Sequence, residues 1–354
     1  MDKRYFSEKV AEWYAGNKRK LPWRSTNDPY KIWLSEIILQ QTRVAQGLPY
    51  YEKFVKAFPD VFSLADAKEQ DVLRLWQGLG YYSRARNLHR CAKTVVRENK
   101  GIFPDNYIDL LKLPGVGGYT AAAIASICHG EAVAVVDGNV YRVLARVFGI
   151  DADIMSTTGR KIFSNLANEL VIGTDAAVYN QAIMEFGALH CTPKQPKCNA
   201  CPIREICFAF KHGLQAALPV KTRSKKPAKR YFYYFVVRNG NKLLMRKRMA
   251  GDIWQGLFDF YLVERTRPAN PELIIEEDNF LKKIKKQTGK IKTSPTYRHL
   301  LSHQTIQSKF ILMECDKVPS AVAEGSMRYY PIRKIHGLPK PVLISRFLSD
   351  YDIL

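Results

Sequence analysis

The sequence predicts two folded units, a mainly α-helical one over residues 1–212 and an α+β one over residues 231–354. Helical spacing of apolar residues runs through the first part, with few β-branched alternations. A basic stretch with two prolines follows, and clusters of aromatic and β-branched residues between turn signals fill the second part. With 354 residues, 46% of them hydrophobic, the chain is long enough to bury more than one core.

Helices are predicted most clearly where apolar residues recur at intervals of three and four. Examples are Asp71–Trp76, Tyr119–Ile127 and Asn139–Val147. Asp28 and Pro29 signal the start of another helix, because an acidic cap and a proline in the first turn both favour initiation.

Residues 213–230 form the predicted linker, with six basic residues and no acidic one. Such a run either contacts phosphate groups or is a solvated tether, and both interpretations stay open.

Four strands are predicted after the linker, where aromatic and β-branched residues cluster between turn residues such as Asn239-Gly240. The predicted strands are 231–237, 242–248, 258–263 and 310–314. Helices are predicted at about 271–288 and 342–348.

The formal net charge of +22 favours a polyanionic partner. Nucleic acid is the commonest such partner, and an anionic membrane surface is the alternative. The sequence shows neither a signal-peptide pattern nor a run of about 18 apolar residues. We therefore expect a soluble protein of the cytoplasm, associated with the nucleoid if the cell is bacterial.

Four of the seven cysteines crowd into one short segment with the spacing C-x6-C-x2-C-x5-C. They are Cys191, Cys198, Cys201 and Cys207. A zinc ribbon needs two C-x2-C pairs separated by a longer loop, and only the central pair fits. Four thiolates in so compact a loop suit a [4Fe–4S] cluster, whose irons each take one sulfur. Zinc is the alternative.

The segment Leu113–Ala121 reads as a helix end, a glycine turn and a new helix of small residues. Gly115 and Gly117 allow positive φ and a close approach of backbone N–H groups to a phosphate, which the helix N-terminus also favours. Such a hairpin grips DNA backbone without reading sequence. An ordinary helix–helix turn is the other interpretation.

Two carboxylates stand out. Glu36 shares a helical face with Ile32 and is flanked by isoleucines, so the pattern predicts a buried carboxyl with a raised pKa, as a general acid near neutral pH requires. A structural pairing with an arginine such as Arg43 is the alternative. Asp137 ends an apolar run before a helix, where it either caps that helix or faces a substrate cleft.

Together these motifs resemble the helix-hairpin-helix glycosylases related to endonuclease III and, within them, the MutY-type adenine DNA glycosylases. The resemblance spans the whole first unit. It rests on the cysteine spacing and on LPWR at 21–24, SEIILQQTRV at 35–44, GLGYYSRARNLH at 78–89, LPGVGGYTAAAI at 113–124 and VDGNVYRVLAR at 136–146.

The resemblance implies an enzyme that acts on duplex DNA and excises adenine mispaired with 8-oxoguanine or guanine. We expect it to act as a monomer. It implies that the adenine is flipped out of the duplex, that Glu36 protonates its N7, and that Asp137 stabilises an oxocarbenium-like sugar. Tyr119 stands where the endonuclease III branch has a nucleophilic lysine, so strong strand-cleaving lyase activity is not expected.

The resemblance also implies roles for further residues. Those expected to line or tune the adenine pocket are Arg19, Leu21, Trp23 and Glu185. Tyr119 and Asn139 are expected near the sugar and the attacking water. The residues expected to contact DNA or the lesion are Gln41, Thr42, Leu79, Tyr81, Gly115, Val116, Gly117, Ser302 and His303.

The second unit is similar to the Nudix-related recognition domain of this family, through the stretch Trp254–Phe260. It lacks the acidic Nudix box, so pyrophosphatase chemistry is not expected. Where the family usually has Phe-Ser-His in the loop that meets the oxidised guanine, this chain has Leu301-Ser302-His303. The loss of the aromatic residue puts a stacking role at that position in doubt.

Overall fold

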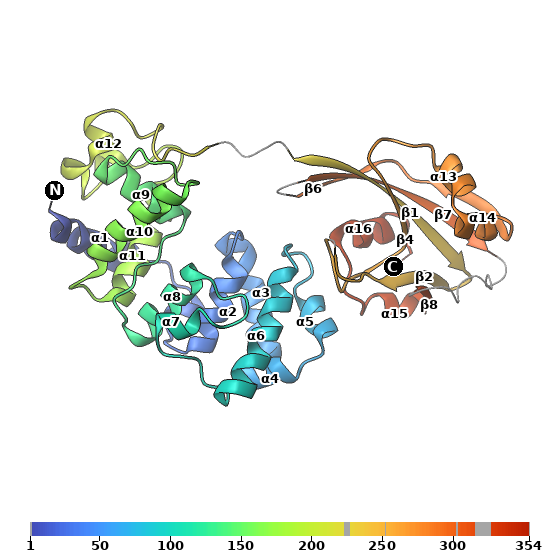
Figure 1. Cartoon of the computed structure of the whole chain (residues 1–354), viewed down its shortest axis with the longest axis horizontal. Helices are drawn as coiled ribbons and strands as arrows, with labels where there is room; N and C mark the ends of the chain where they lie inside the picture. Colours follow the sequence, from blue (N-terminus) through green and yellow to red (C-terminus); the bar gives the residue numbers. More distant parts are fainter. Residues whose placement is uncertain (1, 223–226, 252, 302–303, 316–326, 354) are drawn as a thin grey trace. The chain divides into compact units, whose positions relative to one another are not determined.

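The computed structural model describes residues 2–222, 227–251, 253–301, 304–315 and 327–353. By its contacts the chain divides into two units: residues 1–66 together with 87–224, and residues 67–86 together with 225–354. Figure 1 shows the helices of the N-terminal part and the sheet of the C-terminal part. The boundary given by the contacts falls within the predicted linker.

The chain up to residue 211 is helical, as predicted. Its α-helices are α1 (Lys3–Asn17), α2 (Pro29–Leu39), α3 (Val44–Ala57), α4 (Val61–Asp66), α5 (Glu69–Leu75), α6 (Ser83–Asn99), α7 (Tyr107–Leu110), α8 (Gly118–His129), α9 (Gly138–Phe148), α10 (Thr157–Val171), α11 (Ala176–Leu189) and α12 (Phe208–Lys211). Three short 3-10 helices are η1 (Pro22–Arg24), η2 (Cys198–Ala200) and η3 (Arg204–Ile206). The three helices predicted from apolar spacing are confirmed as α5, α8 and α9.

Local signals explain where the helices of the site begin and end. α2 starts after Asp28, whose carboxylate accepts the N–H of Tyr30, as the sequence predicted. α9 starts after Asp137 and ends at Gly149, which has φ 72°. That left-handed conformation favours glycine and stops the helix.

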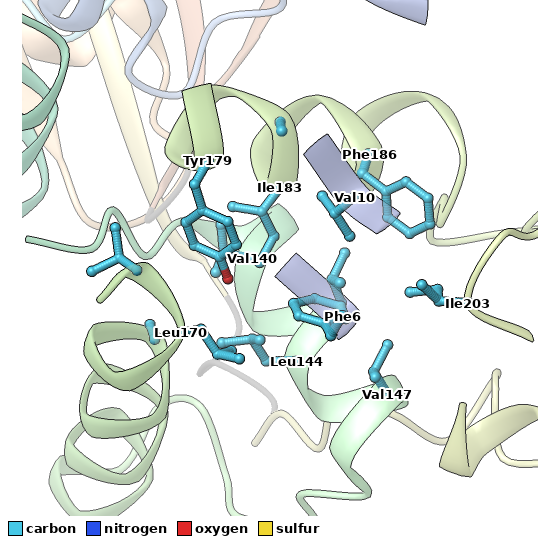
Figure 2. Packing of buried hydrophobic residues seen from close by; sticks show 14 of the residues in the cluster. Phe6, Val10, Val140, Leu144, Val147, Leu170, Tyr179, Ile183, Phe186 and Ile203 are labelled. Carbon is cyan, nitrogen blue, oxygen red and sulfur yellow. The ribbon is translucent and has the colours of Figure 1, made fainter. Parts of the chain in front are cut away.

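The core of the first unit joins α1, α9, α10 and α11 (Figure 2). Phe6 from α1, Leu144 from α9 and Phe186 from α11 meet in it, each fully or almost fully buried. Ile203, from the loop that carries the cysteines, also packs into this core. The cysteine loop is therefore held to the helices that carry the candidate site.

The second unit contains a mixed sheet. In the described residues its strands are β1 (Ala228–Asn239), β2 (Lys242–Lys247), β3 (Phe258–Asp259), β4 (Tyr261–Arg265), β5 (Thr288–Thr293), β6 (Tyr297–Leu300), β7 (Gln304–Cys315) and β8 (Met327–Pro331). β1 and β7 run parallel, from the pair Ala228 and Gln304 to the pair Arg238 and Glu314, and the other strand pairs are antiparallel. All four predicted strands are present, with the third divided into β3 and β4, whereas β5, β6 and β8 were not predicted.

Helices cover both faces of this sheet, which explains the continuous burial of β1. Alternate residues such as Phe235 pack with α13 (Pro271–Glu277) and α14 (Asn279–Lys285) on one face. On the other face Phe310 stacks on Phe347 of α16 (Val342–Asp350), with ring centroids 4.1 Å apart. A short helix, α15 (Ile332–Ile335), precedes α16. The helix predicted over 271–288 is in fact two helices, because Asp278 ends α13 and caps α14.

Residues 67–86 contact the C-terminal part of the second unit. The side chain of Gln77 accepts the backbone N–H of Lys340 and donates to the hydroxyl of Ser345. Arg86 donates to the carbonyl of Gln255 at 2.7 Å. Among the described residues, no helix has the length and apolar character needed to cross a membrane.

Candidate active site

A cavity of about 610 Å³ lies in the first unit, between α2 with the segment before it, the starts of α8 and α9, and α11. We call it the active-site cavity. Nine residues selected from the sequence line it: Arg19, Leu21, Trp23, Glu36, Thr42, Tyr119, Asp137, Asn139 and Glu185. The fold therefore brings the predicted adenine-pocket and catalytic residues to one place, although they come from distant parts of the sequence.

Glu36 lies on α2 with only 8% of its surface exposed, and Ile32, one turn earlier, lines the cavity beside it. Burial raises the pKa of Glu36 to about 7; a hydrogen bond with Tyr119 opposes this rise, and the charge of Asp137 adds to it. The carboxyl group thus keeps its proton close to neutral pH. The charge of Arg24 also lowers the pKa of Glu36, but this effect is smaller than that of burial.

Asp137 both caps a helix and lines the cavity, so the two interpretations of this residue hold together. One carboxylate oxygen accepts the backbone N–H groups of Asn139 and Val140 at 2.8 Å, and the other accepts the side-chain amide of Asn139 at 2.7 Å. Burial raises the pKa of Asp137, while these hydrogen bonds oppose the rise. Three donors therefore stabilise a negative charge at the cavity wall.

Tyr119 lies in the first turn of α8, directly beside Glu36. Its hydroxyl is 3.4 Å from the sulfur of Met184, and burial raises the pKa of Tyr119 well above its usual range. The hydroxyl is therefore a neutral donor, and the described residues that line the cavity include no lysine.

Glu185 is buried beneath the cavity and is paired with two arginines. It accepts the backbone N–H of Arg19 at 3.0 Å, the guanidinium of Arg19, and both terminal nitrogens of Arg24 at 2.7 Å. Burial alone would raise the pKa of Glu185, but hydrogen bonds from Arg24 and Arg19 lower it to about 2. Glu185 is thus ionised at neutral pH and holds the guanidinium groups of Arg19 and Arg24 at the wall of the active-site cavity.

Several lining residues were not predicted from the sequence, and three of them are polar: Arg24, Arg142 and Gln181. Arg142 donates to the side-chain oxygen of Asn139 at 2.9 Å and to the carbonyl of Cys191 at 2.8 Å. Its position one helical turn after Asn139 is a signal that could have identified it. Arg24 ends the LPWR motif, whereas no local pattern marks Gln181.

The glycine hairpin has the predicted geometry at one of its two glycines. Gly115 has φ 77°, and a Cβ atom there would lie 2.6 Å from the Cβ of Asn87. Gly117 has φ −96°, so the prediction of a positive φ is wrong at that position. Gly117 is the N-cap of α8 and supplies no capping side chain, so the first N–H groups of the helix remain available to an anion. Val116, between them, is buried and offers only its backbone.

The four clustered cysteines are free and half-buried. Burial raises the pKa of Cys201 to about 12, and the charges of Cys207, Cys191 and Cys198 add to that rise, so the thiols are close enough to repel one another when ionised. Arg146 of α9 donates to the sulfur of Cys191 at 3.4 Å. Across the described ranges, no group of three His, Cys, Asp or Glu side chains is arranged to hold a single metal ion. Four free thiols on one loop nevertheless suit a cluster in which each iron takes one sulfur.

The residues expected to contact the lesion lie in both units. Gln41 is exposed at the end of α2 with φ 54°, and Thr42 lines the active-site cavity. In the second unit, Leu79 and Tyr81 line another cavity, of about 520 Å³.

That second-unit cavity also involves the loop in which the sequence departs from the family pattern. Trp254, His299 and Leu301 line it. Ser302 and His303 lie outside the described residues.

Comparisons with known proteins cover almost the whole chain. An adenine DNA glycosylase of Buchnera aphidicola (subspecies Schizaphis graminum) is 36% identical over 345 residues, which cover 95% of this chain and 96% of the relative. The chain belongs to the adenine DNA glycosylase family. The human adenine DNA glycosylase is 45% identical over 213 residues, covering 58% of this chain and 39% of that protein.

The domain comparisons agree with the two parts of this adenine DNA glycosylase. Residues 34–169 match the HhH-GPD superfamily of base excision DNA repair proteins, and residues 233–350 match the NUDIX domain. A thermostable thymine-DNA glycosylase is 29% identical, with a TM-score of 0.54 over 59% of this chain and 97% of that chain. The protein is therefore a base excision repair glycosylase, a hydrolase of N-glycosyl bonds that acts on DNA.

Proposed function

We propose that this adenine DNA glycosylase excises adenine paired with 8-oxoguanine, or with guanine, in duplex DNA. The observation that carries the proposal is the buried carboxyl of Glu36, with a pKa of about 7, in a cavity that also holds Asp137. A proton donor and a stabilised anion in one cavity are the two groups that acid-catalysed cleavage of a glycosidic bond needs.

The bond to be broken is hidden inside a duplex, so the adenine must leave the base stack. The active-site cavity then receives the base, between Trp23 and Leu21 on one side and the start of α8 on the other.

In the cleavage step, Glu36 donates its proton to N7 of the adenine. The bond between C1′ and N9 breaks, its electron pair stays with the base, and the sugar becomes an oxocarbenium-like cation. The anionic Asp137 stabilises that cation through space. A water molecule near Tyr119 and Asn139 then adds to C1′ and gives one proton to the carboxylate of Glu36. The products are free adenine and an abasic site, and Glu36 is protonated again.

The chemistry at Tyr119 favours a monofunctional enzyme. A lyase of this type forms a covalent bond between an amine and C1′. The phenol of Tyr119 supplies no amine at this position. We therefore propose that strand cleavage is weak or absent.

We propose that the enzyme grips DNA backbone through the hairpin of Gly115, Val116 and Gly117, aided by the net charge of +22. Gln41 and Tyr81 fill the space left by the flipped base, while Thr42, Leu79, Ser302 and His303 meet the oxidised guanine. The exposed, left-handed positions of Gln41 and Tyr81 support this, since turns of this kind project a side chain outward from the surface. We propose a monomer acting in the cytoplasm, on the nucleoid in a bacterial cell.

We also propose a [4Fe–4S] cluster on Cys191, Cys198, Cys201 and Cys207. Two observations support it: the four thiols are free, and they lie close enough on one loop for their charges to affect the pKa of Cys201. When bound, the cluster would cross-link four points of this loop and so stabilise it against unfolding.

A single-turnover assay tests the proposed function. The substrates are duplexes with adenine opposite 8-oxoguanine, with adenine opposite guanine, or with thymine glycol. Each reaction is analysed with and without alkali, which breaks the strand at abasic sites. We expect base loss from both adenine duplexes, with strand breaks only after alkali. Failure on both adenine duplexes removes the proposal. Cleavage at thymine glycol without alkali would indicate a bifunctional pyrimidine glycosylase instead, and binding without base loss a non-catalytic DNA-binding protein.

A further inference from the structure

A second hollow lies behind the active-site cavity in the first unit. This rear cavity has a volume of about 780 Å³, and its rim includes the exposed residues Lys18, Lys20 and Val178. Five residues line both cavities: Arg19, Leu21, Arg24, Ile127 and Gln181. A single layer of side chains therefore separates the active-site cavity from a solvent-exposed hollow.

The members of this wall are held with unequal strength. Arg19 and Arg24 are fixed to Glu185 by charge-assisted hydrogen bonds. Leu21 and Ile127 are buried by packing. Gln181 is half-buried, and its side-chain oxygen accepts one neutral hydrogen bond, from the hydroxyl of Tyr14 at 2.9 Å. A neutral bond of this kind contributes about 1 kcal/mol. Gln181 is thus the wall residue that moves most easily.

The proposed reaction creates a need for a second opening. The flipped nucleotide enters the active-site cavity through its mouth, and after hydrolysis the abasic sugar is still part of the DNA strand that fills this mouth. The free base is then enclosed between the DNA and the wall. We propose that the excised purine leaves through the rear cavity, past Gln181, while the abasic duplex stays bound; this exit route rests on the proposed function.

The lining of the rear cavity suits a neutral, planar base. Pro22, Ala177 and Val178 line it with apolar surface, along which a purine can pass. The rim carries Asp175 as well as Lys18 and Lys20, and a neutral base passes these charges without a strong attraction to either sign. Polar rim residues such as Asn27 keep the outer end hydrated.

The test follows base and duplex separately after one turnover. Enzyme in excess excises a radiolabelled adenine opposite 8-oxoguanine, and the protein is collected on a filter at intervals. Retained adenine and retained duplex are measured in the same samples. We expect adenine to leave while the duplex remains bound.

A Val178→Trp variant places an indole in the rear cavity, away from the reacting groups. It should slow adenine loss about tenfold, with the rate of excision unchanged. Val178→Thr, of similar size to valine, is the control and should behave as the natural protein. Tyr14→Phe frees Gln181 and should accelerate adenine loss.

Loss of adenine and duplex with one shared rate constant overturns the exit route and leaves the proposed function intact. Release that stays unchanged in Val178→Trp, at a normal excision rate, also overturns it. If Val178→Trp fails to fold, unchanged release in Tyr14→Phe decides against the route. Failed excision by the natural protein overturns both proposals and is visible in the same samples as adenine still attached to DNA.

Discussion

Asn139 holds both oxygens of Asp137, one through its backbone N–H at 2.8 Å and the other through its side-chain amide at 2.7 Å. The same amide group accepts a hydrogen bond from Arg142 through its oxygen. Asn139 therefore links Arg142 to the carboxylate of Asp137 through hydrogen bonds. These bonds also fix the orientation of that carboxylate.

The first prediction concerns this pair. Asn139→Ala removes a hydrogen-bond donor to the charged Asp137, and such a bond contributes about 1.5–3 kcal/mol. If this stabilisation is lost from the transition state, single-turnover excision should fall roughly tenfold to a hundredfold. Asp137→Asn keeps an N-cap acceptor of equal quality and should therefore fold normally, yet lose more activity because the charge is gone. Equal, small effects of both changes would contradict the electrostatic role of Asp137.

The second prediction is a pH profile. Glu36 acts as an acid only when protonated, so the excision rate should fall about tenfold per pH unit above the pKa of about 7. Asp137 must be charged, and burial raises its pKa, so a second loss is expected at acidic pH. Single-turnover rates between about pH 5 and pH 9 test this shape. Asn139→Ala should move only the acidic limb to higher pH.

The third prediction concerns stability. The folded-state pKa of Glu36 is above its ordinary value of 4.5, so its contribution to stability is full below pH 4.5 and is lost as the pH rises through about 7. At 1.36 kcal/mol per pH unit, the difference between 4.5 and 7 corresponds to about 3 kcal/mol at high pH. In urea titrations, Glu36→Gln should be more stable than the natural protein by up to that amount near pH 8.5 and by about 1 kcal/mol at pH 5. A variant that is less stable at both pH values would show that Glu36 is structural.

The fourth prediction concerns Glu185. Glu185→Gln leaves Arg19 and Arg24 without their shared anion, and breaking a buried pair in this way costs about 3–5 kcal/mol. Urea denaturation should show this loss. Glu169→Gln removes an exposed partner of Lys3 and is the matched control, with an expected change below about 1 kcal/mol.

The fifth prediction tests the metal. The purified protein should contain iron and absorb at roughly 400 nm. Cys201→Ser should lose much of both signals, while Cys128→Ser, at a cysteine distant in sequence from the loop, should keep them. A colourless natural protein that contains zinc would reverse the assignment.

The sequence predicted most of what depends on local signals. Asp28 and Asp137 cap the helices that they were expected to begin, and the helical spacing around Glu36 correctly placed its carboxyl in apolar surroundings. The cavity was harder to predict, because no local pattern marks Gln181, which reaches the cavity through the packing of α11. The strands β5, β6 and β8 were missed because they are short or largely exposed, so they lack the alternating apolar pattern that marks a half-buried strand.

The second unit is made from two separate stretches of chain, residues 67–86 and residues 225–354. A protease that cuts within the linker therefore cannot release this unit whole, because α5 and the loop with Tyr81 stay covalently attached to the helical fragment. That fragment would keep its general acid but expose the surfaces of Gln77 and Arg86 that contact the C-terminal chain. Recombinant halves divided at the linker should accordingly bind each other, because the contacts of Gln77 and Arg86 can form again between them.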